Sequence, residues 1–556
     1  MTAPRREEAS NRVLVIGLDG ATFDLLLPWF EEGFLPHIAD IWSRSAYGPL
    51  RSTIPPITAS AWASFQTGVN PGKHGLFDFT EYRPGSYETP FVNAQSMKAE
   101  PLWGVLSRHG KRVVVINCPM TYPPRPVNGV LISGLLTPST KVEFTHPPGL
   151  YQELIREIED YQIFVPVQAS LYLGTRKFVD RLRHATRKRA EAALFLMRRT
   201  DWDFFMVHFQ SPDVLQHSLW SHLDPFHPGY HAVDSETRKY VQGYYRELDS
   251  LVGSVVEEAG DNATTILMSD HGFGPALKRF YVNQWLADEG LLTLRADSLH
   301  KRALDNLEDV LRRADFLKLR RRMIPPYSKQ ETLVRRFTQE SLIDWTTTSA
   351  FALPCASVMR LQINVRGREP MGVVEPGAAY DRLRDDIAGR LLQVRDPATA
   401  RPIVEQVFKR EEIYSGPALE LMPDLVAQPL DGYQIATRFK NGLLFGPLAE
   451  DFTGNHRMDG ILIMAGQHIL TGHRIDTAEI VDLFPTILYL LDTAAPPGLD
   501  GRVLVEALQH DYIKAHALGG QQEVPSPSTE GVGAGTYTPG EAEEIRDRLQ
   551  GLGYLD

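Results

Sequence analysis

Residues 13–20 read VLVIGLDG, an unbroken apolar run that ends in an aspartate and a glycine. A short run without alternation of polar and apolar residues is typical of a strand buried on both faces of a parallel sheet. Helix-length mixed segments separate many runs of this kind, so the sequence predicts an α/β fold with a doubly wound, mostly parallel central sheet and helices on both faces. The other runs are VVVIN (113–117), VLISG (130–134), DFFMVHF (203–209), TTILMSD (264–270), DLVA (424–427) and ILIMAG (461–466).

Two stretches interrupt this alternation of strands and helices. Residues 138–200 are helical in pattern and rich in arginine, which predicts a helical insertion. Residues 285–421 mix helical segments with the strand-like RLQINVRG (360–367), which predicts an α+β cap domain. We therefore expect the catalytic core to comprise residues 11–284 and 422–510.

The last part of the chain, residues 511–556, has a different composition. Residues 518–541 are rich in Gly, Pro, Ser and Thr, as in flexible linkers. The final segment EEIRDRLQGLGYLD has acidic residues first and apolar residues at helical spacing. It predicts a short C-terminal helix that could dock on the core.

The composition excludes several classes of function. A net charge of −11 disfavours a nucleic-acid polymer as partner, because proteins that bind phosphate backbones use clustered Lys and Arg. A small phosphorylated substrate stays compatible with it, since bound metal ions can invert the local charge. Cys118 and Cys355 are too few for a disulfide framework and belong to no C-x-x-C pair.

The sequence also bears on location. The first ten residues, MTAPRREEAS, lack the apolar core of a signal peptide, and no segment approaches the roughly 20 apolar residues of a membrane span. We expect a cytoplasmic protein without a transmembrane segment. The basic stretches 176–189 and 311–322 could make weak peripheral contact with a membrane or guide a phosphorylated substrate, but we favour solvated helix faces.

Candidate metal ligands lie at or beside the ends of the predicted strands. Asp19 follows the first strand, at the edge where open α/β sheets bind ligands, although such an aspartate often only caps a helix. Asp213 and His217 follow DFFMVHF in a D-x-x-x-H spacing, which places both side chains on one face of a helical turn. Each of these signals is weak by itself.

Two further segments complete the set. Asp270 and His271 end the strand TTILMSD and begin SDHGFG, where glycines allow the backbone to turn tightly. His456 lies in GNHRMDG, directly ahead of the strand ILIMAG. Three aspartates and three histidines at strand ends are enough for two ions with three protein ligands each, which leaves coordination positions free for a substrate.

Thr58 is the candidate nucleophile. Pro55 and Pro56 fix an extended approach to a predicted helix, TASAWASFQTG, that Thr58 begins. Thr58 could serve only as the N-cap of this helix. We expect it to do both, because a metal-coordinated hydroxyl at a helix N-terminus is activated and its phosphoryl adduct is stabilised there.

The order of these motifs closely resembles the alkaline phosphatase superfamily, in particular the branch of type I phosphodiesterases and nucleotide pyrophosphatases, which includes predicted phosphohydrolases and phosphomutases. The resemblance covers about 13–134, 203–284 and 422–501. The matching segments are VIGLDG, PPIT followed by TGVNPGKHG, PDVLQH, SDHGFG and GNHRMDG.

The resemblance implies a catalytic centre with two divalent metal ions, usually zinc, with manganese in the mutase branch. It implies that one ion is bound by Asp213, His217 and His456. It assigns the second ion to Asp19, Asp270 and His271, beside Thr58. Thr58 would attack phosphorus in line, and water would then cleave the phospho-threonine.

The resemblance also limits the choice of reaction. Residues 52–79 lack the C-x-P-x-R or S-x-P-x-R signature of sulfatases, and a threonine in a P-x-x-T context resembles the diesterase branch. Nucleotide pyrophosphatases usually have Asn and aromatic residues just after the nucleophile and an Asn after the His-Gly pair. This chain has Ala59, Ser60 and Ala61 and then Asp78 and Phe79, so the resemblance supplies no nucleotide-binding groups.

The sequence therefore predicts a metal-dependent phosphoric ester hydrolase, either a phosphodiesterase or a phosphomonoesterase. A phosphomutase, in which phospho-Thr58 returns its group to the same molecule, is the alternative enzyme. A binding or regulatory module without turnover is the non-enzymatic alternative, which the complete ligand set disfavours. Neither the substrate nor the oligomeric state follows from the sequence.

Overall fold

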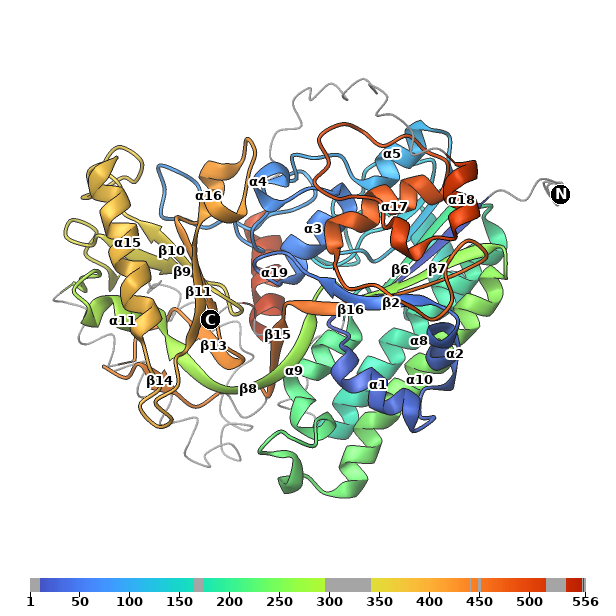
Figure 1. Cartoon of the computed structure of the whole chain (residues 1–556), viewed down its shortest axis with the longest axis horizontal. Helices are drawn as coiled ribbons and strands as arrows, with labels where there is room; N and C mark the ends of the chain where they lie inside the picture. The colour runs from blue at the N-terminus through green and yellow to red at the C-terminus, as the bar shows by residue number, and fades with distance from the viewer. Residues whose placement is uncertain are drawn as a thin grey trace.

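The computed structural model describes residues 11–164, 174–295, 342–440, 442–448, 452–516, 537–552 and 554. A ten-stranded sheet lies at its centre, with strands in the order β17-β2-β16-β7-β1-β6-β3-β4-β5 and with β18 beside β2 (Figure 1). The strands are β1 (Arg12–Leu18), β2 (Ala46–Arg51), β3 (Val113–Ile116), β4 (Gly129–Ile132), β5 (Thr145–His146), β6 (Phe204–Phe209), β7 (Ala263–Met268), β16 (Asp459–Ala465), β17 (His473–Arg474) and β18 (Ala478–Glu479).

The middle of this sheet is parallel, as the sequence predicts. β7, β1, β6, β3 and β4 run in the same direction, and β6 and β7 flank β1. Val13 and Val15 enter one hydrophobic cluster, whereas Leu14 and Ile16 enter the other. Both faces of β1 are thus buried, which is why its sequence is apolar without alternation.

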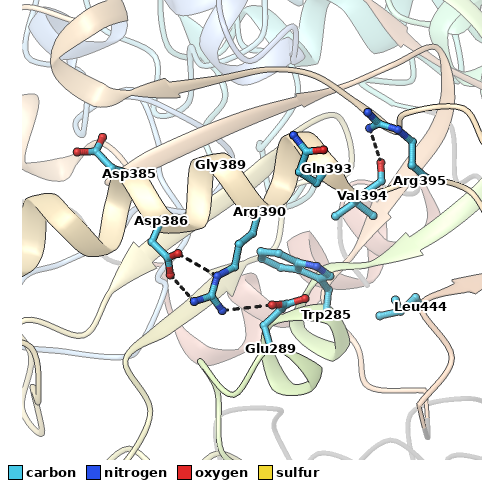
Figure 2. Close-up of a pocket in the computed structure, with 10 residues that line it drawn as sticks. All are labelled: Trp285, Glu289, Asp385, Asp386, Gly389, Arg390, Gln393, Val394, Arg395 and Leu444. Carbon is cyan, nitrogen blue, oxygen red and sulfur yellow. Dashed lines mark hydrogen bonds and ion pairs between the residues drawn. The ribbon is translucent and has the colours of Figure 1, made fainter.

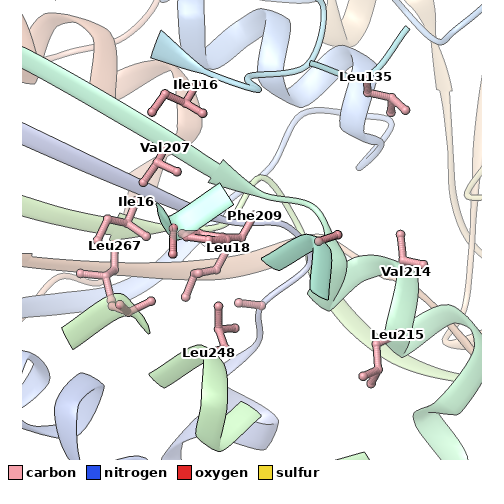
Figure 3. Packing of buried hydrophobic residues seen from close by; sticks show 14 of the residues in the cluster. Ile16, Leu18, Ile116, Leu135, Val207, Phe209, Val214, Leu215, Leu248 and Leu267 are labelled. Atoms are coloured by element: carbon pink, nitrogen blue, oxygen red, sulfur yellow. The ribbon is translucent and has the colours of Figure 1, made fainter. Parts of the chain in front are cut away.

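Helices cover both faces of the sheet, which confirms the doubly wound α/β prediction (Figure 1). Figure 3 shows one layer, where Ile16, Val207 and Leu267 of the strands face Leu248 of a covering helix. The helices on this side are α1 (Phe23–Glu31), α2 (Pro36–Ser43), α8 (Thr175–Arg199), α9 (Ser211–Leu223) and α10 (Ser235–Ala259). Those on the other side are α3 (Thr58–Thr67), α5 (Leu102–Arg108) and α17 (Leu483–Leu490).

The arginine-rich segment 176–189 forms the first half of α8, which packs against α10 and the sheet. Three arginines spaced by three helical turns pair with three glutamates that each lie 60 positions further along the chain. This constant offset means that α8 and α10 run parallel and in register. The pairs are Arg176–Glu236, Arg187–Glu247 and Arg198–Glu258.

Two of the predicted strands differ from the expected parallel arrangement. ILIMAG forms β16, which is antiparallel to both β7 and β2. DLVA forms the start of β12 (Leu425–Pro429), which lies outside the central sheet. Both runs are apolar because they are buried, and burial alone encodes neither the direction of a strand nor the sheet that it joins.

β12 belongs to a four-stranded sheet in the order β11-β12-β10-β9, which is antiparallel throughout. RLQINVRG supplies most of β10, and the sheet has a hydrophobic cluster of its own together with α11 and α15. The basic stretch 311–322 lies outside the described residues. The elements are α11 (Val282–Asp288), β9 (Ala350–Leu353), β10 (Met359–Ile363), α15 (Ala378–Gln393), β11 (Val404–Lys409) and α16 (Arg410–Ile413).

A third sheet connects this region to the core. Its long strand β8 (Gly272–Tyr281) starts directly after the SDH segment and pairs with three partners. The partners are β13 (Gly432–Ala436), β14 (Phe445–Gly446) and β15 (Gly454–Arg457). The remaining helices of the core are α4 (Pro71–His74) and α6 (Leu150–Ile158).

The end of the chain returns to the core. After α18 (His510–Ala515), the predicted linker lies outside the described residues up to residue 536. A C-terminal helix, α19, then spans Pro539–Gly551, so it begins inside the segment 518–541 that we expected to be a linker. Among the described residues, no helix is long and apolar enough to cross a membrane.

Candidate metal centre

The seven predicted site residues meet at the carboxyl edge of the parallel strands. Asp19 directly follows β1, and Asp270 and His271 lie between β7 and β8. Asp213 and His217 lie in α9, which begins just after β6 ends. Each of the seven is at most 8% exposed. Buried carboxylates are costly unless they are paired or bind metal, so this concentration of three aspartates needs a compensating charge.

His456 lies directly ahead of β16, as the sequence predicts, and it forms part of a short strand of its own. It belongs to β15, where it pairs with Phe273 of β8. This pairing brings residue 456 next to the SDH segment.

Asp213, His217 and His456 form one convergent group. His217 Nε2 lies 3.3 Å and His456 Nε2 lies 3.1 Å from Asp213 Oδ1, and the two Nε2 atoms are 2.9 Å apart. Three potential ligand atoms therefore face one point. This is the trio that the sequence resemblance assigns to the first ion.

Asp19, Asp270 and His271 form the second group. His271 Nε2 lies 3.6 Å from Asp19 Oδ1 and 3.3 Å from Asp270 Oδ2. The rings of His271 and His456 stack with their centroids 3.6 Å apart, so the two groups are adjacent. The arrangement is that of two neighbouring cation sites.

The histidine tautomers fit metal binding. The Nδ1 atom of each ring lies close to a backbone carbonyl: Gly454 for His217 (3.2 Å), Gly272 for His271 (3.1 Å) and Pro56 for His456 (2.9 Å). Because Nδ1–H donates to the carbonyl in each case, the lone pair of Nε2 faces the carboxylates. Histidine ligands of metals are held by this kind of second hydrogen bond.

The surroundings of Asp19 and Asp270 are also compatible with metal binding. Asp19 Oδ1 and Asp270 Oδ2 are buried and accept no hydrogen bond from the described residues. Burial and the repulsion from Asp270 raise the pKa of Asp19 well above its usual range, and burial also raises the pKa of Asp270. Burial and the neighbouring His271 lower the pKa of His456 to about 3, so its imidazole is neutral, the form that binds metals. Bound divalent cations would relieve both the missing contacts and the repulsion.

Thr58 lies beside His271, at the start of α3. Its Oγ1 is 3.5 Å from His271 Nε2. The expected N-cap role is wrong, because Ile57 is the N-cap residue and Thr58 is the first helical residue. The Thr58 side chain is therefore free of a capping bond and points into the site, where the amides of the first helical turn favour an anion.

His208 is a site residue that the motifs did not identify. Its Nε2 lies 2.8 Å from Asp19 Oδ2, and its Nδ1 lies 3.1 Å from the carbonyl of Asn117. His208 thus holds one oxygen of Asp19 and leaves the other free for a cation. The only signal in the sequence is a lone histidine inside DFFMVHF, whose apolar pattern predicts a buried strand and no functional role.

Tyr554 is a second residue that sequence reasoning missed. The two residues that its hydroxyl contacts are far away in sequence: Thr58 Oγ1 at 2.9 Å and Asp213 Oδ2 at 3.0 Å. Its ring packs against Phe79 at a centroid distance of 4.7 Å. No local pattern links the end of the chain to a site near its start.

The α+β region between β8 and β12 also reaches the site. Ser357 Oγ lies 3.4 Å from His456 Nδ1. Burial raises the pKa of the Asp78 carboxyl to about 6, although the positive charge of Arg360 acts in the opposite direction. Part of this region thus contacts a candidate metal ligand.

The sequence model of the type I phosphodiesterase / nucleotide pyrophosphatase family matches residues 13–459. This range is most of the chain and contains all seven predicted site residues. The chain belongs to this family. Family membership makes the protein a metal-dependent enzyme that hydrolyses phosphoric esters. Two sets of its buried ligand atoms lie close enough together to hold a metal ion, and His271 belongs to both: Asp213, His271 and His456, and Asp19, Asp270 and His271. A search of curated proteins found no match.

Solved structures place this family member in a known fold. The phosphonoacetate hydrolase of Sinorhizobium meliloti 1021, in complex with phosphonoformate, is 16% identical and covers 87% of this chain and 96% of its own, with a TM-score of 0.55. Human ectonucleotide pyrophosphatase / phosphodiesterase 5 is 15% identical over 91% of this chain and 99% of its own, with a TM-score of 0.48. The first similarity confirms the predicted alkaline phosphatase-like fold.

The protein also has a surface depression that lies apart from the candidate metal centre (Figure 2). It has a volume of about 570 Å³ and is lined by α11 and α15. Arg390 crosses it and pairs with Asp386 at 2.6 Å and with Glu289 at 3.2 Å. None of the seven site residues lines it, so it belongs to the surface of the α+β region.

Proposed function

We propose that the protein hydrolyses a small phosphoric ester, a diester or a monoester, through a phospho-threonine at Thr58. The observation that carries this proposal is the position of Thr58 Oγ1 beside two adjacent groups of ligand atoms, 3.5 Å from His271 Nε2. A nucleophile held next to two cation sites suits in-line phosphoryl transfer.

Two divalent cations would be held by Asp213, His217 and His456 and by Asp19, Asp270 and His271. The mixed imidazole and carboxylate ligands suit zinc, with manganese as the alternative. When bound, such ions would favour loss of the Thr58 proton and would take up negative charge on the substrate oxygens.

The residues of the chain supply the remaining chemistry. Thr58 Oγ1 forms a bond to phosphorus as the bond to the leaving oxygen breaks, and the ester alcohol departs. A water molecule then attacks the phosphorus, the bond to Thr58 Oγ1 breaks, and the hydroxyl of Thr58 is restored. The N-terminal amides of α3 stabilise negative charge that develops next to Thr58.

His208 keeps the site in shape during these steps. By binding Asp19 Oδ2 it fixes the rotation of that carboxylate, so that Oδ1 stays directed at the second ligand group. Oriented ligands of this kind are what a displacement reaction requires.

The test compares aryl diesters, aryl monoesters and phosphonoacetate as substrates of metal-loaded protein. We expect Thr58→Ala to reduce turnover by at least about 10³-fold and Thr58→Ser to retain part of it, because only the serine variant keeps a nucleophilic hydroxyl. Thr67→Ala is the matched control at the other end of α3. Equal turnover by Thr58→Ala and the wild-type protein would refute the phospho-threonine mechanism.

A substrate that rearranges without releasing phosphate would instead identify a phosphomutase.

A further inference from the structure

The C-terminal segment occupies the place that the substrate needs. Tyr554 is buried, and its hydroxyl oxygen lies 2.9 Å from Thr58 Oγ1 and 3.0 Å from Asp213 Oδ2. An attacking oxygen and the phosphorus it attacks are about 3 to 3.5 Å apart in a reactive complex. The phenol oxygen therefore lies where the phosphoryl group would lie.

The ring of Tyr554 fills the space around that position. It packs against Phe79 and also lies close to the two histidines of the first ligand group, with centroid distances of 5.7 Å to both His217 and His456. A phosphoryl group and this side chain cannot occupy the centre together.

α19 anchors this residue. Ile545, Leu549 and Leu552 lie on one side of the segment and are buried in the core. Arg548 donates hydrogen bonds of 2.6 Å to the carbonyls of Thr137 and Pro138. In Figure 1, α19 is seen between the core and the α+β region.

α19 has features of a helix that could detach from the core. α19 has its own N-terminal capping box, in which Thr538 and Glu541 bond each other's backbone amides, so the helix is terminated without help from the core. Its acidic outer side is exposed or half-buried. The segment is thus an amphipathic helix laid on the core, followed by a side chain inserted into the site.

We propose that α19 and Tyr554 form an intramolecular competitor of the phosphoester, resting in the metal centre and leaving it when substrate binds. This inference rests on the proposed function, because it assumes that Thr58 is the nucleophile. A segment that is part of the same chain competes at a high effective concentration, so modest affinity is enough to keep the site closed.

The test measures binding of inorganic phosphate by calorimetry to the full, metal-loaded protein. We expect Tyr554→Ala to bind phosphate at least about tenfold more tightly than the wild-type protein, since nothing then has to leave the site. Arg548→Ala, which loosens the anchor without touching the site, should act in the same direction. Arg546→Ala, an exposed arginine of the same helix, is the matched control and should stay within about twofold.

Hydrogen exchange tests the displacement of α19 without measuring turnover. Adding phosphate to the wild-type protein should increase amide exchange in residues 539–552, because the segment is displaced. Unchanged exchange at saturating phosphate, or equal phosphate affinity in the wild-type protein and Tyr554→Ala, would overturn the proposal. Absence of phosphate binding in every variant would overturn it too.

Turnover of bis-p-nitrophenyl phosphate separates this proposal from the proposed function. A higher kcat/KM in Tyr554→Ala and in Arg548→Ala supports the competitor. A large loss of kcat in both Tyr554→Ala and Tyr554→Phe would show that the phenol assists the reaction, and would refute the competitor. If phosphate binds more tightly to Tyr554→Ala but no ester is hydrolysed by any variant, the hydrolase mechanism fails, and what stands is competition between Tyr554 and phosphate for this centre.

Discussion

At the scale of single residues, the two oxygens of Asp19 have different surroundings. Oδ2 contacts His208, whereas Oδ1 is buried without a hydrogen-bond donor among the described residues. A carboxylate held in this way presents one defined oxygen to a cation. His208 should therefore affect metal binding although it is not itself a proposed ligand.

We predict that His208→Ala weakens metal binding by roughly 10- to 100-fold, the effect usual for the hydrogen-bonding partners of ligands. Competition with a chromophoric chelator measures the affinity. His184→Ala is the control, because His184 is paired with Asp160 at the surface, away from the centre. Equal metal affinity of His208→Ala and the wild-type protein would show that Asp19 needs no such support.

The sequence predicts a site residue when a side chain that can bind metal also stands at the end of a recognisable strand. Asp270 and His271 follow a buried strand directly, so their place at the sheet edge follows from the order of the chain. His208 contributes through its position inside the sheet, and an apolar strand pattern conceals that role. Tyr554 reaches the site only through the docking of α19, a tertiary contact that no spacing encodes.

At the scale of elements, the short helix α4 is joined to α3 by the buried His74. His74 Nδ1 accepts the amide of Leu76 at 3.1 Å, so Nε2 carries the proton and donates to Ser64 Oγ at 2.9 Å. Protonation of Nδ1 would break the first bond. Burial accordingly lowers the pKa of His74 to about 3, against a smaller opposing effect of Asp500.

We predict that His74 makes the protein sensitive to acid. Because its pKa is about 6.5 in the unfolded chain and about 3 in the folded protein, the unfolded state binds the proton more tightly, and stability is lost as the pH falls below about 6.5. The loss should reach roughly 2 kcal/mol at pH 5.

Urea unfolding of the wild-type protein and His74→Gln at pH 7 and pH 5 measures this contribution. The free energy of unfolding should fall by roughly 2 kcal/mol more in the wild-type protein than in the variant over this interval. The same fall in both proteins would mean that other groups cause the acid sensitivity.

The elements also show what an apolar pattern predicts and what it leaves open. The runs at 13–18 and 203–209 became neighbouring parallel strands, as expected. The runs at 424–427 and 461–466 are equally apolar, yet one joined a different sheet and the other entered the central sheet in the opposite direction. Their placement depends on long-range pairing with β10, β11, β7 and β2, which the local sequence does not specify.

At the scale of the whole molecule, the metal centre joins segments from Asp19 to Tyr554. It gathers three buried carboxylates, and burial raises the pKa of two of them, Asp19 and Asp270, which opposes their ionisation. Cations that bind only the folded protein should therefore stabilise the entire chain by linkage. The cytoplasmic location that we expect from the sequence stays a prediction.

We predict that removing metal lowers the thermal midpoint and abolishes turnover. A cation at a hundredfold excess over its Kd stabilises the folded state by about 2.7 kcal/mol per site, so two sites should give a difference of several degrees. Calorimetry with chelator and after restoring zinc or manganese measures it. In the double variant Asp270→Asn, His217→Ala, which has lost a ligand from each group, chelator should change the midpoint little. A wild-type midpoint that is the same with and without chelator would argue against both sites.

The most direct test of the two-metal centre is a crystal structure of the zinc-loaded protein with orthovanadate, using anomalous scattering to locate the metals. We expect two zinc ions, one held by Asp213, His217 and His456 and the other by Asp19, Asp270 and His271. Vanadium should lie between them, bonded to Thr58 Oγ1. A single ion, no ion at these six residues, or vanadium away from Thr58 would refute a two-metal centre with Thr58 as the nucleophile.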